Sequence, residues 1–369
     1  MAAADHEAFR RRRYFGSLDG VRALSIVAVV WHHSDQASAD APLFFQRGFL
    51  GVDMFFVLSG FLIVTLLLRE REREGTISLV GFYGRRSLRI FPLFYALLFA
   101  LSLLAVARPA SSLGRVWFDE LPYVALYLAN WVEVSTMMAI AWSLAAEEQF
   151  YLFWPPLERF APSLAMPVLV GVVALSEAIQ IGWLDGPLEA AVGWGPDEPE
   201  MLRGSTFAPI LLGVLLAHAM HGESGFRAVR RLVGHRLAPV ALGLAILGTI
   251  AAVPPDIRGW ARPTIHLLMM LFLASLVVRE DHALRRPMGW WAVRRIGIVS
   301  YGMYLLHMIA TDLVGRALGA SGLDFPGDHF LLSLALTWGM AELSFAYFEK
   351  PFLRMKSRFS ARSATPRRA

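Results

Sequence analysis

The first apolar segment of the chain holds two side chains that could do chemistry, Arg22 and His33. In a helix, their spacing of eleven residues is three turns plus about 20°, so both lie on one face about 16 Å apart along the axis. His32 points about 80° away from that face. A guanidinium binds oxyanions, and an imidazole takes up protons near neutral pH. A snorkelling arginine and an interfacial histidine would give the same pattern, so the spacing leaves both explanations open.

The elements that must position these side chains are membrane helices. The chain has 369 residues, of which 56% are hydrophobic and 18% charged, and its mean hydropathy is +0.49. Soluble domains rarely have this composition, and the repeated apolar runs exclude a lone core helix or signal peptide. The sequence therefore predicts an all-α, polytopic transmembrane helix bundle. The apolar segments are Ser17–Ser34, Gly48–Leu68, Leu88–Ala107, Leu121–Val132, Ala139–Trp154, Leu164–Leu184, Ser205–Met220, Leu237–Val253, Pro263–Val278, Ile296–Leu318 and Phe330–Phe348.

Basic residues between these segments predict the topology. Arginines cluster before the first segment and after the last, so both termini are predicted to be cytoplasmic, which requires an even number of crossings. One segment, Leu121–Val132, is too short to cross about 30 Å of hydrocarbon at about 1.5 Å per residue. We interpret it as a re-entrant or half-helix segment, which leaves about ten spans. The basic loops predicted to face the cytoplasm are Arg69–Arg89, Arg227–Arg236 and Arg279–Arg295.

The same patterns divide the chain into one membrane domain and two tails. Residues 17–353 form the predicted transmembrane domain, in which no convincing internal repeat is found. Residues 1–16 and 354–369 are basic, and we expect both to be disordered cytoplasmic tails. The expected location is the cell inner membrane.

Composition also excludes several kinds of chemistry. The chain has no cysteine, which removes disulfides, thiolate catalysis and thiolate metal sites. The net charge of +5 lies in short clusters between apolar runs, which suits anionic lipid headgroups rather than nucleic acid. No His-Glu-x-x-His string occurs, and His32 and His33 face different ways, so no metal site is predicted.

Several ordered motifs together resemble the membrane-bound acyltransferase 3 family. Any one of them is an apolar string with a few polar residues, but their order along the chain makes chance resemblance improbable. They are Leu18–Leu24 followed by His33; Gly51–Ile63; Arg85–Pro92; Trp142-Ser143-Leu144 with Glu147, Phe150-Tyr151-Leu152 and Pro155; Ser300-Tyr301 with Tyr304-Leu305 and His307; and Glu349-Lys350-Pro351-Phe352.

This resemblance implies a ten-span fold and transfer of an acyl group, commonly acetyl, from coenzyme A to a hydroxyl. The expected partners are acyl-CoA as a co-substrate, a carbohydrate, lipid-linked sugar or glycosylated metabolite as the acceptor, and membrane lipids. No permanently bound cofactor is expected. The extracytoplasmic hydrolase-like domain that many relatives carry after the membrane part is not expected within these 369 residues.

Four arginines are candidates for binding the donor. Arg85, Arg86 and Arg89 lie where the predicted cytoplasmic loop enters the third segment, and Arg86 and Arg89 share a helical face at i, i+3. Guanidinium groups form paired hydrogen bonds with phosphates such as those of coenzyme A. An ordinary positive-inside cluster is the alternative. With the family match, we assign these three residues and Arg22 to the donor site.

Transfer to a hydroxyl needs a base, and His33 is the candidate. It ends the first span near the predicted outer surface, where Asp53 begins the second, so we expect Asp53 to orient the imidazole and stabilise its cation. Asp53 as a helix cap is the alternative. Glu147, in the middle of a span, is a third catalytic candidate, which either pairs with a buried arginine or takes part in proton transfer. Direct transfer and a covalent acyl-histidine relay both remain open.

Four further residues are assigned to binding of the substrate. Ser300, Tyr304 and His307 form a polar stripe at i, i+4 and i+7, which should face the interior of the bundle. Tyr151 joins them from its motif. An interhelical hydrogen-bond network would explain the same stripe. A transporter or flippase of a sugar- or lipid-linked substrate is the alternative function, although clear inverted repeats and paired broken helices are not found.

Overall fold

The computed structural model describes residues 2–12, 14–34, 46–192, 207–254, 257, 259–321 and 327–359, and these residues form helices and no strands. The N-terminal half consists of α1 (Ala2–Arg11), α2 (Gly16–His32), α4 (Leu50–Glu74), α5 (Leu79–Ala107), α6 (Ser112–Ala125), η1 (Met137–Ile140), α7 (Ala141–Phe160), α8 (Pro162–Ile181) and α9 (Asp185–Val192). The C-terminal half consists of α11 (Ala208–His221), α12 (Glu223–Val233), α13 (Ala238–Ala252), α14 (Ala261–Val278), α15 (Arg285–Met288), α16 (Trp291–Ser321), α17 (Asp328–Leu343), η2 (Ser344–Glu349), α18 (Lys350–Arg354) and η3 (Met355–Phe359).

The predicted membrane bundle is confirmed in class, whereas the number of spans is not. Each of the ten predicted spans overlaps a helix. Among the described residues, however, six helices are both long and apolar enough to cross a membrane, and the number rises to eight if two bent helix pairs each count as one span. In these pairs, α1 meets α2 at 67° and α12 meets α13 at 70°. The structure therefore supports a multi-pass membrane protein with six to eight candidate spans.

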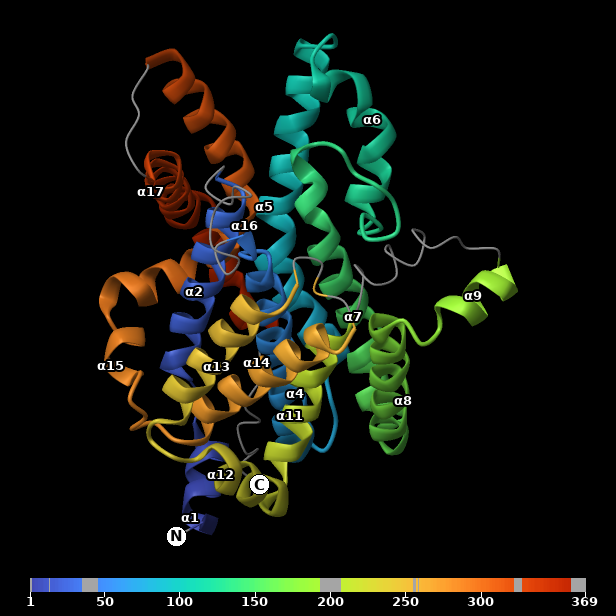
Figure 1. Cartoon of the computed structure of the whole chain (residues 1–369), viewed down its shortest axis with the longest axis vertical. Helices are drawn as coiled ribbons and strands as arrows, with labels where there is room; N and C mark the ends of the chain where they lie inside the picture. Colours follow the sequence, from blue (N-terminus) through green and yellow to red (C-terminus); the bar gives the residue numbers. More distant parts are fainter. Residues whose placement is uncertain are drawn as a thin grey trace, which may run out of the picture.

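The segment predicted to be re-entrant differs in its boundaries. The helix α6 begins at Ser112, because the Ser111 side chain caps it by accepting a hydrogen bond of 3.0 Å from the Gly114 N–H. It ends at Ala125, so the second half of the predicted segment is irregular backbone that returns to η1. The helix α6 is not among the candidate spans, and Figure 1 shows it lying beside α5 and α7.

The N-terminal tail was expected to be disordered, and the structure corrects this expectation. Residues Ala2–Arg11 form α1, which packs on α12 through ring contacts of His6 and Phe9 with Phe226. The Arg69 guanidinium donates to the carbonyl oxygen of Phe9 at 2.8 Å. The arginines that suggested a solvated tail lie at the end of this helix. The overall composition of the tail did not reveal that the helix also has an apolar face. At the other end, helices continue to Phe359, and residues 360–369 lie outside the described part of the chain.

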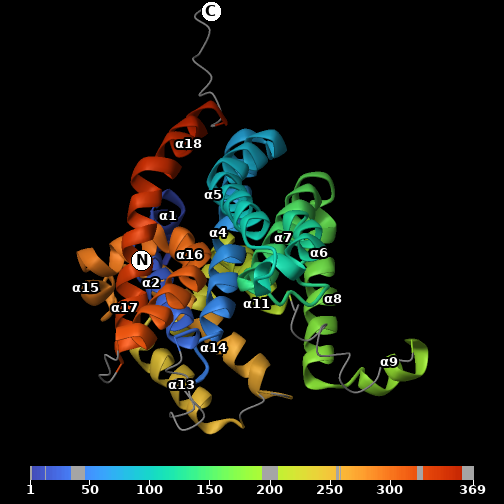
Figure 2. The same cartoon turned by 90° about the horizontal axis from the view of Figure 1, so that it is seen from above.

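The helix α4 lies at the centre of the bundle, among α2, α7, α11 and α14 (Figure 2). Its backbone approaches that of α11 very closely at two glycines. A Cβ atom on Gly60 would lie 1.9 Å from the Ile210 carbonyl oxygen, and one on Gly213 would lie 2.1 Å from that of Val57. Small residues allow such close packing between membrane helices. This contact fixes the position of α4, whose opposite face lines the site described next.

Candidate active site

A cavity of about 380 Å³ lies between α2, α4, α5, α7 and α16. It gathers eight of the eleven predicted site residues, which come from segments far apart in the sequence. These are Arg22, Arg85, Arg86, Arg89, Glu147, Tyr151, Ser300 and Tyr304. The remaining three, His33, Asp53 and His307, do not line it.

The four arginines differ in whether other groups of the protein already bind their guanidinium groups. Arg22 pairs with Asp19 on its own helix at 3.0 Å. Arg85 donates to Glu70 at 3.2 Å and to the Phe359 carbonyl oxygen at 2.6 Å, so both of its terminal nitrogens hold other parts of the protein. Its assignment to the donor site is therefore weaker than the sequence indicated.

Arg86 and Arg89 have no ion-pair partner within 4 Å among the described residues. The Arg86 guanidinium lies over the ring of Tyr151, 4.6 Å from its centroid, which holds the side chain without neutralising it. Both line the cavity. Positive charge that the protein leaves unpaired at a cavity wall suits an anionic ligand.

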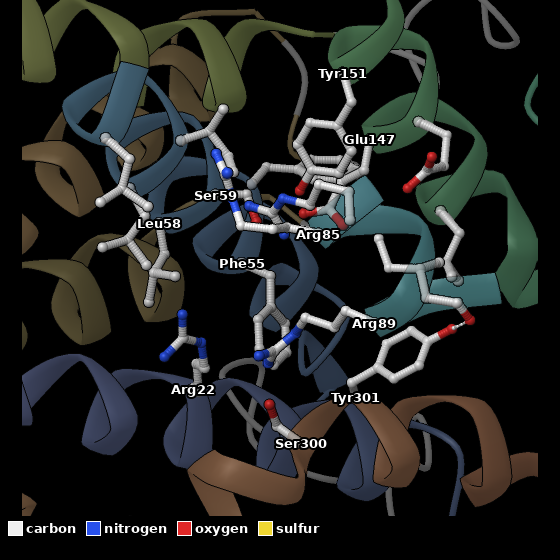
Figure 3. A pocket seen from close by; sticks show the side chains of 18 of the residues that line it. Arg22, Phe55, Leu58, Ser59, Arg85, Arg89, Glu147, Tyr151, Ser300 and Tyr301 are labelled. Atoms are coloured by element: carbon white, nitrogen blue, oxygen red, sulfur yellow. Dashed lines mark hydrogen bonds between the residues drawn. The ribbon is translucent and has the colours of Figure 1, made fainter. Parts of the chain in front are cut away.

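Acidic side chains reach the cavity from α7. The carboxylate of Glu147 faces the hydroxyl groups of Ser59 and Tyr151, and Figure 3 shows these three side chains on one wall with Arg22, Arg89 and Ser300 across from them. Glu148 lines the cavity as well. Glu147 thus lies in the same cavity as the arginines, as its predicted role in pairing with a buried arginine requires.

The polar stripe of α16 continues from the cavity toward the end of the bundle where α2 ends. Ser300 and Tyr304 line the cavity, and the Tyr304 hydroxyl lies 2.5 Å from that of Ser143 and 3.1 Å from the Ile140 carbonyl oxygen. The ring of His307 follows, with its centroid 5.6 Å from that of Tyr304. His307 is fully buried. The stripe therefore faces the interior, as predicted.

His33 meets His307 at the end of this stripe, with 4.9 Å between the ring centroids. Nδ1 of His33 lies 3.0 Å from the carbonyl oxygen of Val29, and Nδ1 of His307 lies 2.6 Å from that of Tyr304. A carbonyl oxygen only accepts, so each Nδ1 carries a proton and each neutral ring has its lone pair on Nε2. Nε2 of His307 is buried and has no hydrogen-bond partner in the described structure. Nε2 of His33 is therefore the nitrogen that is able to accept a proton.

Comparison with known proteins identifies the family. The acyltransferase domain family matches residues 15–346. The chain belongs to this family. It is 28% identical over 363 residues to the peptidoglycan O-acetyltransferase OatA of Listeria monocytogenes, covering 92% of this chain and 56% of that protein. It is 27% identical over 379 residues to the O-acetyltransferase OatA of Staphylococcus aureus, covering 96% of this chain and 60% of that protein. The chain spans less than two thirds of these relatives' length. No solved structure matches it.

The structure does not pair Asp53 with His33, and this corrects the prediction. Asp53 accepts a hydrogen bond from Nε2 of His266 at 3.1 Å and lies 4.0 Å from Arg262, both on α14. The face of α4 that carries Asp53 packs on α14, whereas α2 approaches α4 at Gly48 and Gly51. Sequence reasoning assigned no role to His266, because nothing in its local sequence signals a partner on a distant helix.

Two further features of the candidate site were not predicted. The π-helix η2 brings Glu349, which is buried, close enough to Arg89 for electrostatic interaction. The family motif Glu349-Lys350-Pro351-Phe352 was the signal available in the sequence. The π-helical turn is consistent with a functional role, because such turns often occur at functional sites. The second feature is Tyr301, which lines the cavity and donates to the Ile90 carbonyl oxygen at 2.6 Å. The described residues contain no cluster of three or more His, Asp or Glu side chains suited to a metal ion.

Proposed function

We propose that this acyltransferase moves an acetyl group from acetyl-CoA to a hydroxyl of a carbohydrate, with His33 as the general base. One observation carries the proposal: a single polar wall connects cavity arginines that lack ion-pair partners in the described structure to a histidine beyond the cavity, whose Nε2 is able to accept a proton. The wall runs from Arg86 and Arg89 past Tyr304 to His307 and His33. The names of the relatives support acetyl as the acyl group and a peptidoglycan sugar as the acceptor.

The arginine end fits the phosphates of the donor. Arg86 and Arg89, aided by Arg22, offer guanidinium groups that bind phosphate oxygens in charge-assisted hydrogen bonds. Apolar side chains such as Phe55, Leu58 and Leu62 also line the cavity. An elongated donor with an anionic head and a long arm would place its thioester at the far end of such a passage.

The reaction at that far end needs one base and no bound metal. As the acceptor oxygen attacks the thioester carbonyl carbon, Nε2 of His33 takes the hydroxyl proton. The carbon–sulfur bond then breaks, an ester forms, and the coenzyme A thiolate receives the proton back from the imidazolium. The Val29 carbonyl oxygen holds Nδ1–H of His33 throughout, which keeps Nε2 directed to the proton transfer.

We further propose that the protein lies in the cell inner membrane with about ten spans and both termini cytoplasmic. The basic segments, among them the start of α5 with Arg85 and Arg86, support this orientation. It places the donor arginines on the side where acyl-CoA is made, and it places the acceptor on the opposite side.

The test is to incubate purified protein with acetyl-CoA and a soluble peptidoglycan fragment, and to measure thiol release together with the mass of the saccharide. We expect thiol release that depends on the saccharide, and a gain of one acetyl group on it. A wild-type protein that leaves the thioester intact with every saccharide tested would overturn the proposal and favour a transporter.

A further inference from the structure

The chain between α6 and η1, residues 126–136, enters the bundle as irregular backbone, and Tyr127 lies at its start. The φ angle of Tyr127 is 55°, in the left-handed region. Its N–H donates to the Val124 carbonyl oxygen at 3.2 Å, and the Leu128 N–H donates to that of Tyr123 at 2.7 Å. This is a helix-terminating turn in which glycine is usual, because a Cβ atom is disfavoured there. A tyrosine at this place therefore needs a specific explanation.

Packing of the aromatic ring explains only part of Tyr127. The ring stacks on Phe94, with 4.8 Å between centroids and 19° between planes, and lies 5.9 Å from Phe91. A phenylalanine would stack equally well. The hydroxyl group is buried and has no hydrogen-bond partner in the described structure. Burying an unpartnered hydroxyl is unfavourable, so packing alone would favour phenylalanine at this position.

Glu148 presents a second unpartnered oxygen beside Tyr127. Its Oε1 atom is buried and makes no hydrogen bond to the described residues, and the side chain lines the cavity. Its carboxylate lies close enough to the Tyr127 phenol to interact with it electrostatically. Glu148 directly precedes Gln149, whose Nε2 donates to the Tyr127 carbonyl oxygen at 2.8 Å, so a hydroxyl donor and a carboxylate acceptor that lack partners in the described structure lie on adjoining segments.

The loop is held in this position by a network that does not use either group. Nε2 of Gln149 donates to the Tyr127 carbonyl oxygen and to Oδ1 of Asn130, both at 2.8 Å. Successive residues of α7 therefore have different tasks: Glu147 faces Ser59 and Tyr151, Glu148 lines the cavity beside Tyr127, and Gln149 anchors the loop. Irregular backbone at membrane depth is tolerated where it is enclosed or lines a cavity, and broken helices often form substrate sites.

We propose that Tyr127 and Glu148 bind a hydroxyl-bearing sugar ring of the acceptor, an inference that rests on the proposed function. A sugar hydroxyl both donates and accepts, so it could donate to Glu148 while accepting from the Tyr127 O–H. The acceptor then enters along the α6–η1 loop, and the donor enters past the arginines.

The experiment measures saccharide binding directly, so that it does not depend on turnover. Purified full-length protein is titrated with an N-acetylglucosamine tetramer and with a soluble peptidoglycan fragment. We expect Tyr127→Phe and Glu148→Gln each to weaken binding about tenfold or more, the scale of one lost hydrogen bond in a buried site. The double variant should be hardly worse than either single one, because both groups hold the same hydroxyl.

Tyr95→Phe is the matched control. The ring of Tyr95 lies 6.5 Å from that of Tyr127, but its hydroxyl is satisfied by the Ala125 carbonyl oxygen at 3.0 Å. We expect this variant to bind the saccharides as the wild type does, and we expect Tyr127→Phe to keep or raise the melting temperature. Equal saccharide affinity in Tyr127→Phe, Glu148→Gln and wild type would overturn the proposal, as would no saccharide binding by the wild type. Acetyl-CoA binding is measured in parallel. A wild-type protein that does not bind acetyl-CoA would refute the proposed donor site, whereas saccharide binding alone decides the proposed acceptor site.

Discussion

Two glutamates of α7, Glu147 and Glu158, lie inside the bundle in contrasting environments. Glu158 is fully buried, and its carboxylate binds Arg71 at 3.1 Å, Nε2 of His218 at 2.7 Å and Nε1 of Trp154 at 3.2 Å. Glu147 instead faces a cavity that it shares with arginines lacking ion-pair partners in the described structure. The protein itself satisfies the first cluster, whereas the second still has charge available for a ligand.

This difference separates a structural buried charge from a functional one. A buried ion is expensive unless its partners satisfy it, so a complete network around Glu158 holds α4, α7 and α11 together. The cavity beside Glu147 keeps positive charge that is useful only when an anion binds. Substitutions in the first cluster should therefore change stability, and substitutions around the second should change binding or turnover.

The largest effect is expected from Arg71→Met, which leaves the buried Glu158 carboxylate with only His218 and Trp154 as side-chain partners. The free energy of unfolding should fall by about 3 kcal/mol, the scale for breaking a buried ion pair. Thermal unfolding in detergent measures it, and acetyl-CoA affinity of the folded fraction should not change. The control is Arg73→Met, because Arg73 pairs with Glu74 at the surface and should contribute little. Equal stability of both variants would contradict a structural role for the Glu158 cluster.

Next comes His33→Ala, which should lower turnover about 100-fold or more, as expected when a general base is removed. Donor affinity and melting temperature should remain close to those of the wild type. His32→Ala should do much less, because the His32 ring packs on Phe49 and not on His307 at the end of the polar stripe. Rates of acetyl transfer at saturating acetyl-CoA provide the measurement. A fully active His33 variant would end the proposed mechanism.

A smaller effect should follow from removing either unpaired arginine. Arg86→Ala or Arg89→Ala should weaken acetyl-CoA binding by about 1.5–3 kcal/mol, the scale of hydrogen bonds to charged groups. Arg85→Ala is the internal comparison, because its nitrogens already bind Glu70 and Phe359. It should weaken binding less and stability more. Calorimetric titration with acetyl-CoA distinguishes the three, and equal losses of affinity would mean that the existing partners of Arg85 do not matter.

The smallest effect should come from a surface pair outside the spans, Arg279 with Asp281 at 2.5 Å. The hydrogen bond from Arg279 lowers the pKa of Asp281 from 3.8 to about 2. Because the folded-state pKa is depressed, the stabilisation is present above about pH 4 and is lost as the pH falls toward 2. Solvent screening limits it to less than about 1 kcal/mol. Unfolding curves of wild type and Asp281→Asn should differ slightly at pH 5 and converge near pH 2, and neutral-pH turnover should be equal.

The sequence by itself determined the helical class, the approximate positions of the helices, and eight of the residues that line the cavity. Apolar runs of membrane length have few alternatives to helices, because backbone groups must be satisfied within the segment. Spacing at i, i+3, i+4 and i+7 placed Arg86 with Arg89 and Ser300 with Tyr304 on common faces that do line the cavity. These inferences are local, and local geometry within one helix follows directly from the sequence.

Only the tertiary structure decided which buried groups meet across helices. It gave Asp53 the partner His266, 213 residues away, and not His33 across a short connection. In the tertiary structure, α1 packs on Phe226 and Arg85 donates to the Phe359 carbonyl oxygen. Tyr127 lies in a turn with positive φ, close enough to Glu148 for electrostatic interaction. Such pairings depend on how closely two helices pack and on which faces they turn toward each other. In this bundle those choices are set by contacts such as Gly60 on the Ile210 carbonyl oxygen, which no single helical segment contains.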